Sequence, residues 1–106
     1  MTTPWVKVAA ATDVSPGGLK AVETGGKRLV LCNAGGTFYA VDDRCTHDDG
    51  PLADGTLDDR LIECPRHGAR FDLATGAVEC LPAAVPIRSY PVKVEGRDVF
   101  VNVSER

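Results

Sequence analysis

The stretch from Asp42 to Asp72 contains two short motifs, Cys45-Thr46-His47 and Cys64-Pro65-Arg66-His67. Each motif pairs one thiolate with one imidazole, and both histidines of the chain and two of its four cysteines lie here. One such loop offers only two ligands and cannot close a metal site. The sixteen residues between the motifs are enough for an intervening hairpin. We therefore expect the two loops to face each other around one metal centre.

The donor set of two sulfurs and two nitrogens fits two kinds of centre. It occurs in [2Fe–2S] centres in which His replaces Cys on one iron. The same four atoms could hold one zinc ion tetrahedrally, but zinc modules usually group Cys with Cys and His with His. Here each motif carries one residue of each kind. The pattern favours a two-iron cluster between two loops, with a zinc-stabilised interaction module as the alternative.

The sequence around the two motifs predicts an all-β fold. Short alternating apolar and polar runs are bounded by Gly, Pro and Asp, and no window of ten or more residues has helical periodicity. Trp5 and Val6 are expected to be core anchors of the first strand. Leu81–Pro86 contains two prolines and is not expected to hold regular structure. The expected strands are Trp5–Ala11, Leu19–Glu23, Arg28–Asn33, Thr37–Val41, Leu61–Glu63, Ala69–Asp72, Ala77–Cys80, Ile87–Val94 and Asp98–Val103.

Length and charge restrict the class of protein. A chain of 106 residues predicts one domain, 1–106. The formal net charge of −3 provides no basic stripe for nucleic acid. No apolar run is long enough to span a bilayer, and Met1–Trp5 does not resemble a secretory signal. We therefore expect a cytoplasmic protein whose cysteines stay reduced and are available to metals.

With these motifs in place, the chain resembles Rieske-type ferredoxins. It is most similar to the ferredoxin components of bacterial aromatic-ring-hydroxylating dioxygenase systems, over nearly its whole length. The resemblance implies a β-sandwich base carrying a cluster-binding subdomain at about 43–86, with a proline loop covering the cluster. The residues that carry it are Cys45-Thr46-His47, Gly50-Pro51-Leu52, Gly55, Ile62-Glu63-Cys64-Pro65, His67-Gly68, Phe71-Asp72, Thr75-Gly76 and Leu81-Pro82-Ala83.

The resemblance also implies a ligand set and a function. Cys45 and Cys64 would bind one iron of a single [2Fe–2S] cluster, and His47 and His67 would bind the other iron near the surface. The protein would be a non-enzymatic, monomeric carrier of single electrons from a flavin-dependent NAD(P)H reductase to a terminal non-haem iron oxygenase. The alternative within the fold is the Rieske-like small subunit of an assimilatory nitrite reductase.

Four positions differ from the Rieske proteins of respiratory and photosynthetic complexes. Gly50 and Arg66 stand where those proteins have a disulfide, and Ala69 and Phe71 replace a Ser and a Tyr that donate hydrogen bonds to the cluster or a ligating sulfur. Such hydrogen bonds stabilise the reduced cluster, so their absence lowers the reduction potential. We expect a potential at the low end of the Rieske range of roughly −150 to +300 mV.

The remaining polar and sulfur-containing residues near the motifs have simpler interpretations. Cys32 lies in an apolar strand and is expected to be a core residue, and Cys80 lies near the proline loop; neither is expected to bind metal. The acids around the first motif either support turns and solubility or form a docking face for a basic partner. These acids are Asp42, Asp43, Asp48 and Asp49.

Overall fold

The computed structural model describes residues 5–24, 26–44, 51–65, 68–80 and 86–103. Within these ranges the chain forms eleven strands and two short 3-10 helices, which confirms the all-β prediction. The 3-10 helices are η1 (Ala11–Asp13) and η2 (Leu52–Asp54). The strands are β1 (Trp5–Ala10), β2 (Leu19–Thr24), β3 (Lys27–Ala34), β4 (Thr37–Asp42), β5 (Thr56–Asp58), β6 (Leu61–Glu63), β7 (Arg70–Asp72), β8 (Val78–Cys80), β9 (Ser89–Tyr90), β10 (Val92–Glu95) and β11 (Asp98–Asn102).

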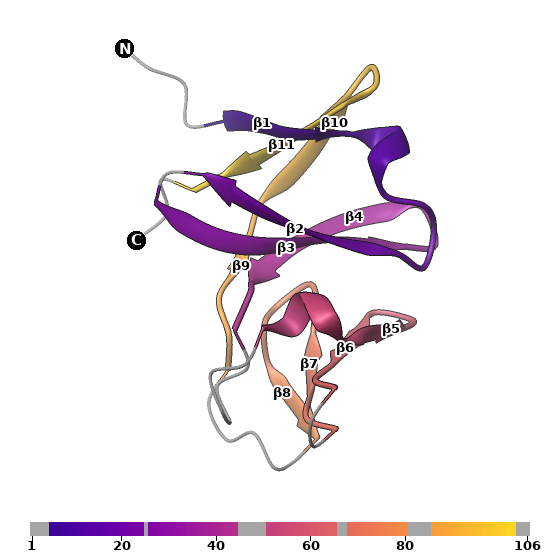
Figure 1. Cartoon of the computed structure of the whole chain (residues 1–106), viewed down its shortest axis with the longest axis vertical. Coiled ribbons are helices and arrows are strands. Elements are labelled where there is room, and N and C mark those ends of the chain that lie inside the picture. Colours follow the sequence, from indigo (N-terminus) through magenta and orange to yellow (C-terminus); the bar gives the residue numbers. More distant parts are fainter. Residues whose placement is uncertain (1–4, 25, 45–50, 66–67, 81–85, 104–106) are drawn as a thin grey trace.

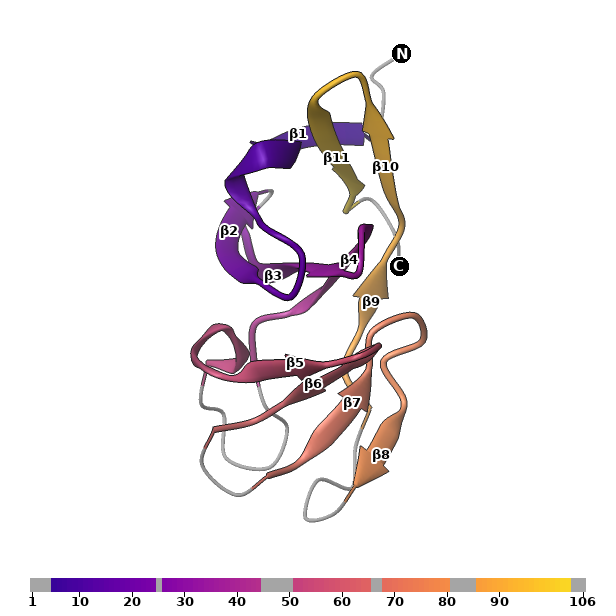
Figure 2. The same cartoon turned by 90° about the vertical axis from the view of Figure 1, so that its right-hand side faces the viewer.

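The strands form three antiparallel sheets stacked along the long axis of the molecule (Figure 1). Sheet A has the order β1-β11-β10, sheet B the order β2-β3-β4-β9, and sheet C the order β5-β6-β7-β8. Figure 2 shows sheet B between the other two, with β9 leading from the sheet C end of the molecule back to β10. Sheet B therefore combines three strands that precede sheet C in the sequence, β2, β3 and β4, with one that follows it, β9.

Strand β3 is buried on both faces, which explains its continuous apolar run. Leu29 and Leu31 point into a core shared with sheet A, whereas Val30 and Cys32 point into a core shared with sheet C. All four are fully buried. Since successive side chains of a strand point to opposite faces, a strand between two cores needs apolar residues at every position.

We call these two regions the A–B core and the B–C core. The A–B core consists of Ala9, Val14, Leu29, Leu31, Ala40, Tyr90, Val99 and Val101. The B–C core consists of Val30, Cys32, Val41, Leu52, Ile62, Cys64, Ala69, Phe71, Leu73 and Ile87. The predicted ligand Cys64 is thus part of the B–C core.

Two details of the predicted strands are wrong. Val6 is 37% exposed and is not a core anchor, while Trp5 is half-buried with the Lys93 Nζ 4.8 Å from its ring centroid. The expected strand Ile87–Val94 is divided at Pro91 into β9, which pairs with β4, and β10, which pairs with β11. Pro91 has no N–H to donate to a ladder, so the chain changes sheets there.

Candidate metal centre

The second motif begins at the end of β6, where the Cys64 side chain enters the B–C core. Cys64 is only 1% exposed. Its backbone N–H donates to the Ala69 carbonyl (2.8 Å), and its own carbonyl accepts from Gly68 N–H (3.2 Å). Gly68 has a φ of +78°, a conformation that glycine adopts without strain. A tight turn therefore starts at a buried thiol, as the predicted ligand loop requires.

The hairpin of β5 and β6 supports this turn from one side. Asp59 (φ +58°) occupies the hairpin turn, which pairs Thr56 with Glu63 at the far end. Gly55 packs so closely on the Glu63 carbonyl that any side chain at this position would collide with it. Arg70 then bridges the hairpin and β7, with its Nη2 3.0 Å from Glu63 Oε1. The expected hairpin between the two motifs is present, although β5 itself was not placed from the sequence.

Ala69 and Phe71, the two positions that lack the hydroxyl groups, pack in the same core as Cys64. Ala69 and Phe71 are both fully buried, and Phe71 has the largest of the fully buried side chains. The surroundings of this thiol among the described residues are therefore apolar, and neither Ala69 nor Phe71 offers a hydroxyl donor.

On the side of the first motif, Asp43 is a buried structural residue. Its side chain is 0% exposed, and its Oδ1 accepts a hydrogen bond from Ala53 N–H in η2 (2.8 Å). Its Oδ2 lies 3.6 Å from Arg28 Nη2, at the start of β3. Asp43 thus fixes the segment before Cys45 to both η2 and sheet B, and the docking-face interpretation of this acid is wrong.

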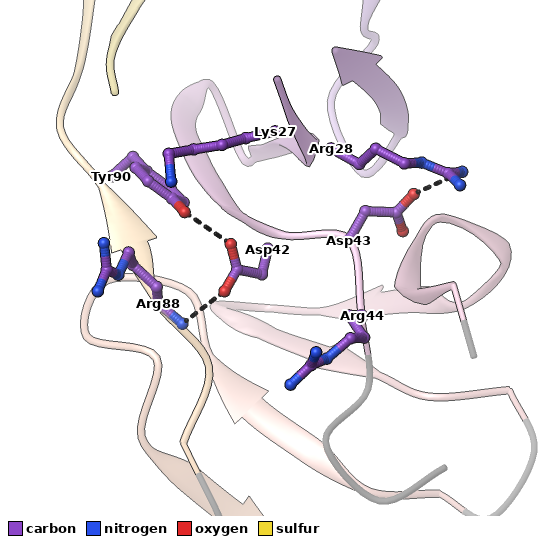
Figure 3. Close-up of a pocket in the computed structure, with 7 residues that line it drawn as sticks. All are labelled: Lys27, Arg28, Asp42, Asp43, Arg44, Arg88 and Tyr90. Carbon is purple, nitrogen blue, oxygen red and sulfur yellow. Dashed lines mark hydrogen bonds and ion pairs between the residues drawn. The ribbon is translucent and has the colours of Figure 1, made fainter. Parts of the chain in front are cut away.

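Asp42 is also engaged within the fold. Its Oδ1 accepts from the Tyr90 hydroxyl (2.7 Å), and its Oδ2 accepts from Arg88 N–H (3.4 Å). Figure 3 shows this carboxylate between β4 and the segment that leads into β9. Asp42 therefore joins the end of β4, before sheet C, to the segment that follows sheet C and leads into β9. Asp48 and Asp49 lie outside the described residues.

Of the four predicted ligands, the structure describes Cys64 alone. Cys45, His47 and His67 lie outside the described residues, as do Gly50, Arg66 and residues 81–85 of the expected proline loop. Among the residues that the structure does describe, no three Cys, His, Asp or Glu side chains come together as a metal site. The chemistry of the donor set and the buried thiol of Cys64 at the head of a tight turn fit a [2Fe–2S] cluster.

Cys32 is confirmed as a core residue. It is fully buried on β3, and burial, with a smaller contribution from the charge of Asp43, raises the pKa of its thiol to about 12. Cys32 therefore remains a neutral thiol at physiological pH. The side chain of Cys80 lies outside the described part of the chain.

Comparison with known proteins identifies the class. The Rieske [2Fe-2S] domain family matches residues 4–91, and the chain belongs to this family. The predicted cofactor of the chain, a [2Fe–2S] cluster, is confirmed by this match. Within the described ranges no helix is long and apolar enough to cross a membrane.

The relatives narrow the class to ferredoxins. The chain is 41% identical over 97 residues to the ferredoxin component of biphenyl 2,3-dioxygenase from Rhodococcus jostii, covering 92% of this chain and 91% of the relative. It is 40% identical over 104 residues to the ferredoxin component of the naphthalene 1,2-dioxygenase system from Pseudomonas putida, covering 98% and 100%. These relatives confirm an electron-transfer protein rather than an enzyme.

Solved structures agree with this assignment. The ferredoxin of carbazole 1,9a-dioxygenase from Nocardioides aromaticivorans superposes with a TM-score of 0.89 at 34% identity, covering 93% of this chain and 97% of that ferredoxin. A chain in a complex of reduced oxygenase and oxidized ferredoxin of carbazole 1,9a-dioxygenase gives a TM-score of 0.90 at 38% identity, covering 99% and 98%.

Proposed function

We propose that this protein carries single electrons from a flavin-dependent NAD(P)H reductase to a terminal non-haem iron oxygenase that acts on aromatic compounds. The observation that carries the proposal is the near full-length similarity to ferredoxin components of biphenyl and naphthalene dioxygenase systems. A complex of reduced oxygenase with oxidized ferredoxin among the similar structures supports the oxygenase as a partner. We further propose that it acts as a monomer in the cytoplasm, where the buried thiol of Cys32 would stay reduced.

In this proposal Cys45 and Cys64 hold one iron of the cluster, and His47 and His67 hold the other. The bound cluster would accept and release one electron at a time. The buried thiol of Cys64, at the head of the turn to Ala69, supports its part in the assignment. We place the cluster-binding subdomain at about 43–86, a range that contains all of sheet C.

The ligand assignment is tested by iron content. Replacing Cys45, His47, Cys64 or His67 singly with Ala should abolish the stoichiometric binding of iron and sulfide. Cys32→Ala is the matched control, because Cys32 is equally buried in the B–C core but is not a proposed ligand. A cluster that survives Cys64→Ala, or that requires Cys32, would refute the assignment.

The carrier function is tested by reconstitution. The purified holoprotein should be necessary for NAD(P)H-driven, oxygen-dependent product formation by the reductase and the oxygenase encoded near its gene. Stable co-purification with a large sirohaem-containing subunit would instead support the nitrite reductase alternative.

We also propose that the apolar surroundings of Cys64 keep the reduction potential low. Ala69→Ser would place a hydroxyl beside the turn that begins at Cys64, and a donated hydrogen bond would favour the reduced state. The potential should rise in this variant and stay unchanged in Ala74→Ser, whose side chain is exposed on the turn between β7 and β8. A potential of the unaltered protein above about +100 mV, in the upper part of the Rieske range, would contradict the proposal.

A further inference from the structure

A cleft of about 550 Å³ opens beside the end of β4, where the chain leaves sheet B. Its walls come from the start of β3, the end of β4 and the segment that leads into β9. The described residues that line it include four bases and two acids. The bases, which define what we call the basic cleft, are Lys27, Arg28, Arg44 and Arg88.

The acids in this cleft are already engaged with the protein. Asp43 is buried against Ala53 and Arg28, and Asp42 accepts hydrogen bonds from the neutral donors Tyr90 hydroxyl and Arg88 N–H. Figure 3 shows the Arg88 guanidinium directed away from the Asp42 carboxylate, while Arg28 points toward Asp43. Among the described residues that line the cleft, four bases therefore accompany two acids, on a chain whose formal net charge is −3.

We infer that the basic cleft is a docking surface for carboxylate groups of an acidic redox-partner protein. The guanidinium groups suit this role, because Arg presents a rigid fork of donors that matches a carboxylate. Arg28, Arg44 and Arg88 are exposed, so a protein surface can reach them. Small-molecule sites, in contrast, are mostly apolar and bury most of their ligand, which a rim of exposed cations does not do.

The basic cleft lies next to a proposed cluster ligand, so a partner docked there could exchange electrons with the cluster. This part of the inference rests on the proposed function. Arg44 immediately precedes the proposed ligand Cys45, and consecutive α-carbons are about 3.8 Å apart. A partner whose carboxylates contact Arg44 and Arg88 would therefore lie beside the first proposed ligand, Cys45. Opposite charges on the two surfaces would also accelerate their encounter.

The sign of the salt dependence tests the inference directly. The reduced protein gives one electron to hexacyanoferrate(III), a trianion, which becomes hexacyanoferrate(II), and stopped-flow absorption measures the rate constant. Raising the ionic strength from about 0.01 M to about 0.1 M shortens the Debye length from about 30 Å to about 10 Å. If the anion reacts at the basic cleft, the rate constant should fall, by about tenfold. A rate constant that rises would show that the net negative charge governs the encounter, which would overturn the inference.

A matched pair of double variants locates the effect. Arg44→Gln with Arg88→Gln should abolish or reverse the fall, whereas Lys20→Gln with Arg97→Gln, at exposed positions outside the cleft, should keep it. Both pairs change the net charge equally. Loss of the fall in the control pair alone would overturn the inference. A protein that takes no electron from dithionite would instead refute the proposed function.

Two further measurements do not depend on turnover. The redox-inert trianion hexacyanocobaltate(III) should shift the amide resonances of Lys27 and Tyr90 in the oxidised protein, and the absence of any shift would overturn the inference. A triglutamate peptide should slow oxidation by hexacyanoferrate(III) at constant ionic strength, whereas a trilysine peptide should not. Inhibition by ADP but not by triglutamate would overturn protein docking in favour of a nucleotide site.

Discussion

The A–B core and the B–C core lie on opposite faces of β3 but are built differently. Sheet A covers the first with strands of four to six residues, whereas every strand of sheet C has three. Such short strands provide few ladder hydrogen bonds and little area for packing. Sheet C instead contributes large buried side chains, among them Ile62 and Phe71, and has close backbone approaches at Gly55 and Gly76. Because Cys64 packs in the B–C core and not in the A–B core, we expect substitutions in the B–C core to disturb the proposed cluster site more.

The largest effect should come from Phe71→Ala. Removal of this fully buried ring should reduce the free energy of unfolding by about 4 kcal/mol. Because Phe71 packs in the same core as Cys64, iron should also be lost. Urea unfolding followed by circular dichroism and iron analysis measure the two effects.

Leu31→Ala is the matched change in the A–B core. Leu31 is also fully buried, and the substitution should cost about 3 kcal/mol. Iron content should nevertheless stay at that of the unaltered protein. If Leu31→Ala loses iron while Phe71→Ala retains it, the contrast between the cores is wrong.

The next largest effect should come from Gly76→Ala, in the turn between β7 and β8. Gly76 has a φ of +80°, and a Cβ there would collide with the Ile87 carbonyl. The Gly76 carbonyl also accepts from Ile87 N–H (2.9 Å), so this contact joins sheet C to the segment before β9. We expect a loss of about 3 kcal/mol in the free energy of unfolding.

Gly35→Ala is the control that separates the cost of the steric collision at Gly76 from the cost of a positive φ alone. Gly35 has a φ of +65° in the hairpin of β3 and β4, with open space around it. Its substitution should cost only about 1 kcal/mol. Equal losses in the two variants would show that the close approach to Ile87 contributes nothing.

Local sequence patterns predicted most of the strands, but they did not predict the contacts between segments that are distant in the sequence. Leu61–Glu63 is a strand as expected, and Cys32 is a core residue, because both follow from short apolar runs. Three residues were too few to reveal β5 by alternation. The burial of Asp43 was missed because it depends on η2 and on Arg28, which are distant in the sequence. The basic cleft was missed for the same reason, since its bases come from three separate segments.

Asp43→Ala should have a smaller effect, because it removes one hydrogen bond, from Ala53 N–H, and one ion pair, with the exposed Arg28. The Ala53 N–H would lose its partner in a part-buried position, at a cost of about 2 kcal/mol. Asp58→Ala is the control, since the Asp58–Arg70 ion pair is exposed and should contribute less than about 0.5 kcal/mol. Thermal unfolding of both variants checks the difference, and equal destabilisation would show that Asp43 does not anchor the first motif.

The pH dependence of the free energy of unfolding should depend on Cys32. Its thiol has a pKa of about 12 in the folded protein against 9.0 for an unperturbed thiol. Above about pH 9 the unfolded chain loses this proton while the folded chain keeps it, so stability should fall as pH rises toward 12, by at most about 1.4 kcal/mol per unit. The Cys32→Ala variant should lack this component of the alkaline loss. An identical pH dependence in both proteins would contradict the burial of the thiol.

The most direct test of the central claim is electron paramagnetic resonance of the dithionite-reduced protein. A [2Fe–2S] cluster held by Cys45, Cys64, His47 and His67 should give a paramagnetic signal whose average g value lies below that of an all-cysteine cluster. A signal of the all-cysteine kind would contradict the ligand set. A colourless protein that contains zinc and gives no paramagnetic signal would contradict the presence of the cluster.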